Sequence, residues 1–177
     1  ELSHSVCQKT GWTPQHIVIK DNKNILIGAL PNYLKMHSYG EYIFDHSWAN
    51  AFENAGGQYY PKLLSAIPFT PATGPRFLIR DDNVDKDKIF ELLINTIENL
   101  VKNNNFSSAH INFISKDVST KLNHKNWIER KGLQFHWHNK EYKTFNDFLE
   151  KLKSTKRKAI KKERQKATIT LLSNVII

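Results

Sequence analysis

The sequence is poor in cysteine and contains no long apolar run. Its 177 residues include one cysteine, Cys7, which excludes a disulfide framework and any zinc site built from several cysteines. No stretch approaches the roughly 18 consecutive apolar residues that a membrane-spanning helix needs. The first residues, ELSHSVCQKTGW, lack the basic and then apolar pattern of a secretory signal. These absences predict a soluble cytoplasmic protein without membrane insertion.

Charge is distributed unevenly along the chain. The net charge is +9, and the segment 151–166 contributes +8 of it through nine basic residues and one acid, so the rest is close to neutral. Such a segment is either a solvated helix face or a surface that binds the phosphates of RNA or of a nucleotide carrier. It lacks the apolar face that membrane docking requires. The candidate anion-binding residues are Lys156, Arg157, Lys158, Lys161, Lys162 and Arg164.

Hydrophobic periodicity predicts a mixed α/β fold. Apolar residues recur at helical spacing over 85–103, and two β-branched runs flank the turn-prone DNKN segment as in a hairpin. The hydrophobic content of 40% allows one sizeable core. We expect strands over 16–20, 25–30, 59–67, 76–80, 109–114, 133–138 and 168–172. We expect helices over 46–55, 85–103, 120–130 and 144–167.

The chain ends on the β-prone segment TITLLSNVII. An exposed segment of this kind would promote aggregation, so we expect further protein after Ile177. The organisation predicted from these patterns is an α/β domain over 1–143, a basic linking helix over 144–167 and the start of a second domain over 168–177.

Two runs between residues 31 and 76 combine aromatic, acidic and small residues without helical or strand periodicity. Pro61, Pro68, Pro71 and Pro75 stiffen the second run. Stiff loops of this kind often hold polar groups around a ligand. The alternative is a long connection whose aromatic side chains merely cover a sheet edge.

General acid–base chemistry has candidates in the first of these runs. A carboxylate at Glu41, surrounded by aromatic residues and four positions after His37, could have a raised pKa and accept a proton from an amine. Surface exposure of Glu41 is the competing interpretation. Asp45 stands directly before a predicted helix, a position that favours N-capping. Lys62 and Arg76 could hold a carboxylate or phosphate of a substrate.

Metal binding and cysteine chemistry have weaker support. His136 and His138 would face the same side of a strand, but no matching ligands stand at metal-binding spacing, so a structural role is favoured and no metal is expected. Cys7 has only Lys9 as a basic neighbour in sequence, which argues against a nucleophilic thiol.

Three long strings carry a resemblance to a known family. They are PNYLKMHSYGEYIFDHSWANAF, YYPKLLSAIPFTPATGPRFL and FHWHNKEYKTFNDFLEKLKSTKRKAIKKER. They resemble bacterial FemAB-like proteins, which are predicted N-acyltransferases of peptidoglycan biosynthesis with two GNAT-like halves joined through basic helices. The order of the predicted elements is also similar to a GNAT fold. This chain looks like the first half and the linking helix. The resemblance implies transfer of an acyl or aminoacyl group to an amine, with acyl-CoA or aminoacyl-tRNA as the possible donor.

No segment matches the glycine-rich turn R/Q-x-x-G-x-G/A with which GNAT enzymes hold the CoA pyrophosphate. We therefore expect no cofactor in this chain, and the resemblance assigns the donor to the other half. The hypothesis is a substrate-recognition half for a small-molecule or peptide amine. The expected acceptor cleft is lined by His37, Ser38, Glu41, Tyr59, Tyr60, Lys62, Thr70, Thr73 and Arg76. The alternative is a module that binds RNA or a nucleotide carrier through the basic segment 151–166.

Overall fold

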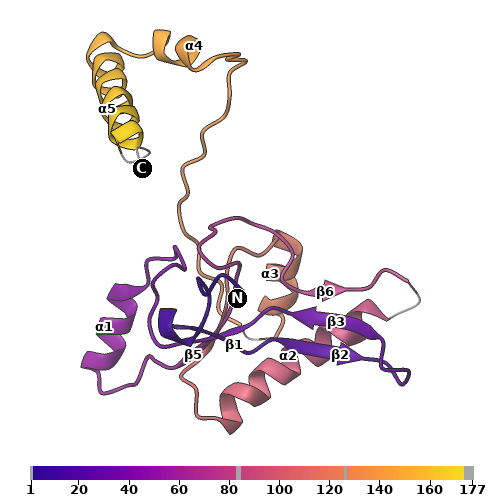
Figure 1. Ribbon diagram of the computed structural model, residues 1–177. Coiled ribbons are helices and arrows are strands. Elements are labelled where there is room, and N and C mark those ends of the chain that lie inside the picture. Colours follow the sequence, from indigo (N-terminus) through magenta and orange to yellow (C-terminus); the bar gives the residue numbers. More distant parts are fainter. Residues whose placement is uncertain (1, 83–84, 126, 174–177) are drawn as a thin grey trace. The chain divides into compact units, whose positions relative to one another are not determined.

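The structure, a computed structural model, describes residues 2–82, 85–125 and 127–173 (Figure 1). The chain divides into two units, Glu1–Gly132 and Leu133–Ile177. Each unit is described by itself below. No helix among the described residues has both the length and the apolar character needed to cross a membrane.

The first unit contains two sheets, so the predicted mixed α/β character is confirmed. One sheet has the order β1-β4-β5-β7 and the other has the order β2-β3-β6. All neighbouring strands are antiparallel except β5 and β7, which are parallel. The strands of the first sheet are β1 (Trp12–Pro14), β4 (Tyr33–Lys35), β5 (Lys62–Ser65) and β7 (Ala109–Ile111). Those of the second are β2 (Ile17–Lys20), β3 (Leu26–Leu30) and β6 (Leu78–Ile79).

The predicted hairpin is confirmed as β2 and β3. Its turn is closed by Asp21, whose Oδ1 accepts hydrogen bonds from the backbone N–H groups of Lys23 and Ile25, each at 2.8 Å. A side-chain acceptor at the start of a turn replaces a backbone partner and favours reversal of the chain. The local sequence is therefore sufficient to explain this element.

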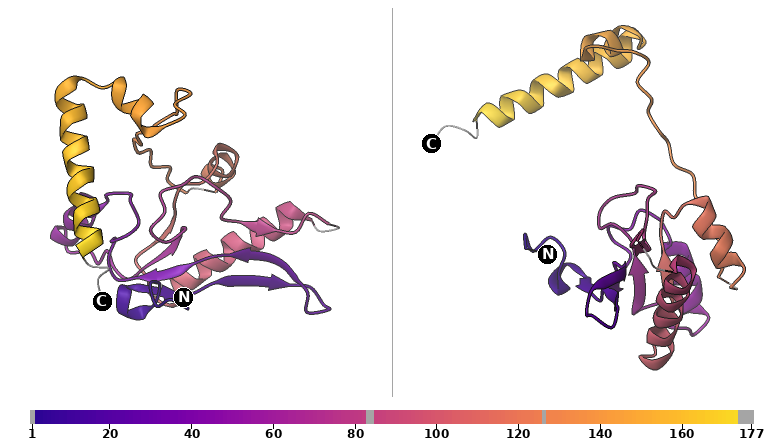
Figure 2. Two further views of the ribbon diagram at one scale, coloured as in Figure 1. Left: turned by 45° about the horizontal axis from the view of Figure 1, so that its top comes forward. Right: turned by 90° about the vertical axis from the view of Figure 1, so that its right-hand side faces the viewer.

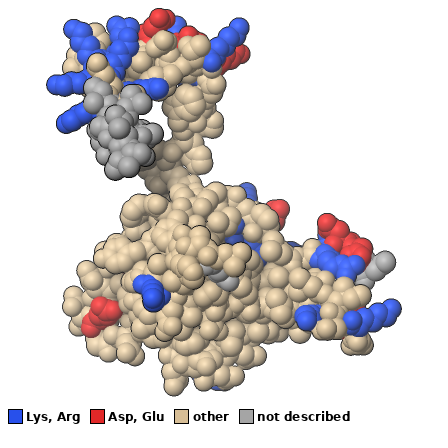
Figure 3. All heavy atoms as spheres, in the orientation of Figure 1, with Lys and Arg blue, Asp and Glu red and all other residues tan. Residues whose placement is uncertain are grey.

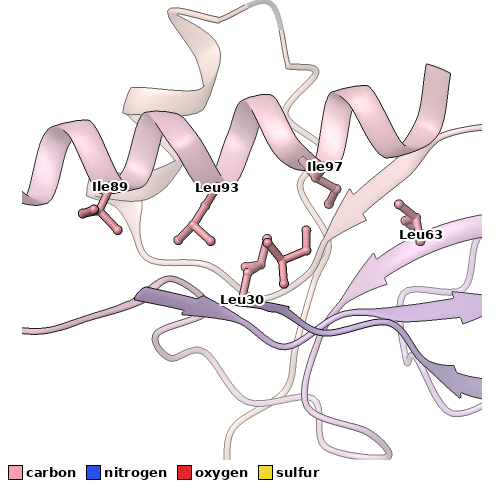
Figure 4. Packing of buried hydrophobic residues seen from close by; sticks show 6 residues of the cluster. Leu30, Leu63, Ile89, Leu93 and Ile97 are labelled. Atoms are coloured by element: carbon pink, nitrogen blue, oxygen red, sulfur yellow. The ribbon is translucent and has the colours of Figure 1, made fainter. Parts of the chain in front are cut away.

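Helix α2 (Lys86–Asn103) confirms the predicted amphipathic helix. Asp85 caps it by accepting a hydrogen bond from the Lys88 N–H at 3.0 Å. Its buried side chains Ile89, Leu93 and Ile97 pack against Leu30 and Leu63 (Figure 4). Full burial of one such side chain contributes about 1.5–3 kcal/mol. Figure 2 shows α2 running along one side of the strands of this unit.

Several other predicted bounds are wrong. The strands expected over 59–67, 76–80 and 109–114 are the shorter β5, β6 and β7, and the sequence missed the three-residue strands β1 and β4. Short strands depend on pairing with distant segments more than on their own periodicity. Helix α1 (His46–Asn54) matches its prediction, and a short 3-10 helix, η1 (Gln8–Thr10), precedes β1.

Helix α3 (Lys116–Asn123) begins and ends earlier than the expected helix over 120–130. Ser115 starts it by accepting a hydrogen bond from the Val118 N–H at 3.5 Å. The strand expected over 133–138 is also wrong, because these described residues form neither helix nor strand. Their side chains are all exposed, so no sheet covers their aromatic members.

The second unit contains α4 (Phe145–Glu150) and α5 (Ser154–Ser173) where one helix was expected over 144–167. Thr144 and Asp147 form a capping box at the start of α4. The strand expected over 168–172 is wrong, because these residues continue α5. Extending an existing helix costs little, whereas a strand needs a partner. Residues 174–177 of the expected second domain lie outside the described residues.

Candidate functional site

One face of the β1-β4-β5-β7 sheet carries charged residues. Tyr33 and Leu64 pack with Trp12 on this face, whereas Leu34 and Leu63 pack on the opposite face, against the helix α2 cluster. Side chains alternate along a strand. Lys35 and Lys62 therefore lie on the Trp12 face, where the antiparallel register places them directly opposite each other.

Lys62 is the centre of the cluster. Its Nζ lies 2.7 Å from Asp45 Oδ2 and 3.0 Å from Glu41 Oε2, and it donates a hydrogen bond to Ser38 Oγ at 2.8 Å. The Lys62, Glu41 and Asp45 side chains are fully buried in these ion pairs. Breaking a buried ion pair by removing one partner typically costs about 3–5 kcal/mol. The stability of the cluster therefore depends on the presence of all three charged side chains.

Two tyrosine hydroxyls and one imidazole complete the cluster. Tyr59 donates a hydrogen bond to Asp45 Oδ2 at 2.8 Å, and the hydroxyls of Tyr60 and Ser38 are hydrogen-bonded at 2.8 Å. His110, on β7, brings a ring nitrogen into a group with carboxylate oxygens of Glu41 and Asp45 in which all three atoms lie within 4.8 Å of one another. That spacing could suit a metal ion, but the amino group of Lys62 already bridges the two carboxylates.

Lys35 lies beside the cluster without a direct carboxylate partner among the described ion pairs. Its Nζ is 3.6 Å from the centroid of the Trp12 ring and donates to the Tyr39 carbonyl oxygen at 3.3 Å. The electron-rich face of an indole attracts a cation. The Lys35 side chain is fully buried. Two buried lysines therefore share one face of a small sheet.

Burial and neighbouring charges shift the pKa values of the cluster in different directions. Burial raises the pKa of Glu41, although Lys62 opposes this shift. Burial also acts to raise the pKa of Asp45, but the hydrogen bonds that it receives, first from Lys62, hold that pKa at about 2. Burial lowers the pKa of Lys35 to about 8 and that of His110 to about 4. Perturbed groups of this kind gather at functional sites.

The loop that carries Glu41 has a strained backbone. Tyr42 has φ 58° and Phe44 has φ 51°, in the left-handed region that bulky side chains avoid, and Gly40 has φ 79°. A Cβ at Gly40 would lie 2.6 Å from the Phe69 ring, so only glycine fits there. Strained residues cost roughly 1–3 kcal/mol each and cluster at ligand sites. The loop backbone therefore has a conformation that costs free energy.

The predicted capping role of Asp45 is wrong. Asp45 occupies the N-cap position of α1, but its side chain makes no capping hydrogen bond. Its Oδ2 instead accepts from Lys62 and Tyr59. An ion pair with a buried amine outweighs a cap hydrogen bond that water could replace at an exposed helix end.

The structure separates the other predicted cleft residues from the Lys62 cluster. Arg76 is buried and donates to the backbone carbonyls of Ala72, Gly74, Pro75 and Asn112. It therefore stiffens the proline-rich loop on which Thr70 and Thr73 are exposed. His37 is half-buried, and its Nδ1 accepts from the Tyr39 N–H at 3.2 Å. Burial, followed by the charge of Lys35, lowers the pKa of His37.

The candidate anion-binding residues of the second unit lie on α5, where all but the half-buried Arg157 are exposed. Figure 3 shows Lys and Arg side chains gathered over this helix, whereas the visible face of the first unit is largely uncharged. The rings of His136 and His138 stack with their centroids 6.4 Å apart, in a segment that is not a strand. Cys7 is half-buried near the N-terminus.

Sequence reasoning missed Lys35 and His110. The only signal for Lys35 was its position two residues after Tyr33, which would place both on one face of a strand. His110 stands in a segment that was predicted as a strand, but nothing local indicates which buried groups it faces. Both positions depend on the pairing of β4, β5 and β7.

The comparisons with known proteins identify a family. A protein-family model, FemAB-like, described as peptidoglycan biosynthesis/recognition, matches residues 1–174. No curated protein and no solved structure matches the chain.

Proposed function

The chain belongs to the FemAB-like family of peptidoglycan biosynthesis/recognition proteins, and we propose that it is the substrate-recognition half of an N-acyltransferase. In this proposal the chain binds an acceptor amine and an acyl or aminoacyl group is transferred to that amine. The GNAT-like two-half organisation belongs to the same proposal. The Lys62 cluster, formed by Lys62, Glu41, Asp45, Ser38, Tyr59, Tyr60 and His110, is the proposed acceptor site.

The observation that carries the proposal is the burial of the Glu41 carboxyl group with one of its oxygens unpaired in the part of the chain that the structure describes. This carboxyl group is 2% exposed, and its pKa is raised by burial. Among the described residues its Oε1 has no hydrogen-bond partner, while Oε2 lies against Lys62. A buried carboxylate with a raised pKa and a free oxygen is suited to accept a proton.

The chemistry assigns a separate task to each group. The acceptor nitrogen attacks the acyl carbon, a C–N bond forms, and the bond from that carbon to the donor's leaving group breaks. The proton lost by the nitrogen passes to Glu41 and from there to the leaving group. The acceptor attacks as the neutral amine, and Asp45, held ionised by Lys62 and Tyr59, keeps negative charge beside the positive charge that develops on the nitrogen as the C–N bond forms. The hydroxyls of Ser38 and Tyr60, which are hydrogen-bonded to each other, offer polar contacts that orient the amine.

Access to Glu41 is proposed through the strained loop. Tyr39, Tyr42 and Phe44 on this loop are exposed, at 69%, 46% and 76% respectively, directly around the buried Glu41. The strain at Tyr42 and Phe44 lowers the energy needed for the loop to move away. A substrate that displaces this loop would gain apolar contact with the three rings as its amine reaches the carboxylates.

Calorimetric titration tests this proposal. The ligand is a soluble peptidoglycan stem peptide with a free side-chain amine, and the matched control is the same peptide after acetylation of that amine. We expect saturable binding of the free amine and at least tenfold weaker binding of the acetylated peptide. Glu41→Gln should weaken binding of the free amine, whereas Glu91→Gln, a change at a half-buried residue of α2 outside the cluster, should not. Equal binding of the two peptides would exclude the Lys62 cluster as an amine site.

A further inference from the structure

The second unit contains an aromatic pocket that the proposed function does not use. Its volume is about 500 Å³, and it is lined by Trp137, Asn139, Tyr142, Thr144, Phe145 and Phe148. Trp137 and Tyr142 lie nearly parallel, with an interplanar angle of 25°. Phe148 stands edge-on to Trp137, with ring centroids 5.9 Å apart. The pocket therefore offers flat aromatic faces in a space of the size that small-molecule ligands occupy.

A basic groove continues this pocket along α5. The groove has a volume of about 300 Å³ and is lined by Thr144, Phe145, Asn146, Leu149, Lys161 and Arg164. Thr144 and Phe145 belong to both cavities. The guanidinium of Arg164 lies 4.1 Å from the centroid of the Phe145 ring. One continuous surface thus joins aromatic faces to two exposed cations.

Local hydrogen bonds hold the surface in shape. Asn139 Oδ1 accepts from the Tyr142 N–H at 2.8 Å, and its Nδ2 donates to the Tyr142 carbonyl oxygen at 3.1 Å. The Thr144 hydroxyl donates to Asp147 Oδ1 at 2.7 Å within the capping box of α4. A pocket that is already ordered loses less entropy when a ligand binds.

We propose that this surface is a nucleotide site, in which a nucleobase stacks in the aromatic pocket and its phosphate lies on Lys161 and Arg164. Aromatic side chains combined with a positively charged groove are the features with which proteins bind single-stranded nucleic acids. Of the basic residues of α5, Lys161 and Arg164 are assigned to the phosphate, because these two line the basic groove. A free nucleotide and a nucleotide within a strand share this chemistry.

An anionic membrane surface is the main competing ligand, and the structure disfavours it. Membrane-surface helices present one apolar face to the lipid. Along α5, the side chains from 154 to 168 are exposed except for the half-buried Arg157 and Ile160. The aromatic rings that could enter a bilayer pack against one another around the pocket instead of along the helix.

Fluorescence anisotropy with a labelled ten-residue oligothymidylate tests the site in the 177-residue chain. Trp137→Leu should weaken binding at least about fivefold, because it removes one stacking face. Lys161→Gln/Arg164→Gln should weaken binding about tenfold or more and reduce the salt slope by about 1.4, which corresponds to two single-strand phosphate contacts. Lys158→Gln/Lys162→Gln removes the same charge on a neighbouring helix face and should change the affinity less than threefold.

Competition experiments distinguish free nucleotides from nucleic-acid strands as the ligand. If thymidine monophosphate competes at a concentration similar to that of the oligomer's nucleotides, the site binds free nucleotides. If only oligomers compete, the site binds strands. Either result supports a nucleotide site. If Lys161→Gln/Arg164→Gln and Lys158→Gln/Lys162→Gln weaken oligomer binding equally and Trp137→Leu has no effect, the binding is unspecific charge attraction. That result would overturn the proposal. Binding to phosphatidylglycerol vesicles without binding to the oligomer would overturn it in favour of a membrane surface.

Discussion

Lys35 and Lys62 lie directly opposite each other on the antiparallel strands β4 and β5, and both side chains are fully buried. Two basic side chains in this position would repel each other in a low-dielectric interior. The loop that follows β4 provides the compensation, because Glu41 lies against Lys62 and the Tyr39 carbonyl accepts from Lys35. The sheet and the loop therefore depend on each other for stability.

Replacement of Lys62 tests this dependence. Lys62→Met leaves Glu41 and Asp45 buried without their shared partner, so the free energy of unfolding should fall by about 3–5 kcal/mol. Lys121→Met is the control, because Lys121 pairs with Asp87 at 2.6 Å on the surface and should cost no more than about 1 kcal/mol. Urea denaturation measures both. Similar losses in the two variants would contradict the role of Lys62 as the centre of the cluster.

The lowered pKa of Lys35 makes a prediction at alkaline pH. Its folded-state pKa is about 8 and its ordinary value is 10.5. Between these two values the unfolded chain binds a proton that the folded chain does not bind, so Lys35 should make stability rise as pH increases through this range. Chemical denaturation at pH 8 and pH 10 should show this contribution in the native chain and not in Lys35→Met. An identical change in both would place the pKa of Lys35 near its ordinary value.

Asp45 should make stability fall in acid. Its pKa is about 2 in the folded chain and 3.8 ordinarily. The stabilisation is therefore present above 3.8 and is lost as pH falls towards about 2. Asp45→Asn should remove this part of the acid response, measured by thermal unfolding from pH 5 to pH 2. The contribution of Glu41 to stability changes with pH in the opposite direction. Because its pKa is raised, that contribution is present below 4.5 and is lost as pH rises. An acid response unchanged by Asp45→Asn would argue against the Lys62–Asp45 pair.

Two neighbouring leucines of α2 test the core. Leu93 is fully buried against the strands, whereas Leu92 is 42% exposed. Leu93→Ala should lower the free energy of unfolding by about 2–5 kcal/mol, because it removes buried surface and leaves a cavity. Leu92→Ala makes the same chemical change and should cost much less. Equal costs in urea denaturation would mean that α2 does not bury the face seen in Figure 4.

Several elements were determined by the sequence alone because their causes are local. Helix α2 follows from its apolar spacing and from Asp85, which caps the helix through a hydrogen bond within its first turn. The β2–β3 hairpin likewise follows from two apolar runs and the Asp21 turn. These contacts join residues a few positions apart, so their pattern is visible in the sequence.

Other features were decided by tertiary structure. Asp45 stands where a cap is expected, but Lys62, 17 positions away, takes its carboxylate. Glu41, Ser38, Tyr59 and Tyr60 were expected to share a site, and the structure brings them around Lys62, whereas Arg76 turns to the backbone of its own loop. The partners of Lys35 and His110 follow from strand pairing. A buried charge takes the partner that the fold brings near it, because leaving it unpaired costs more than losing a local hydrogen bond.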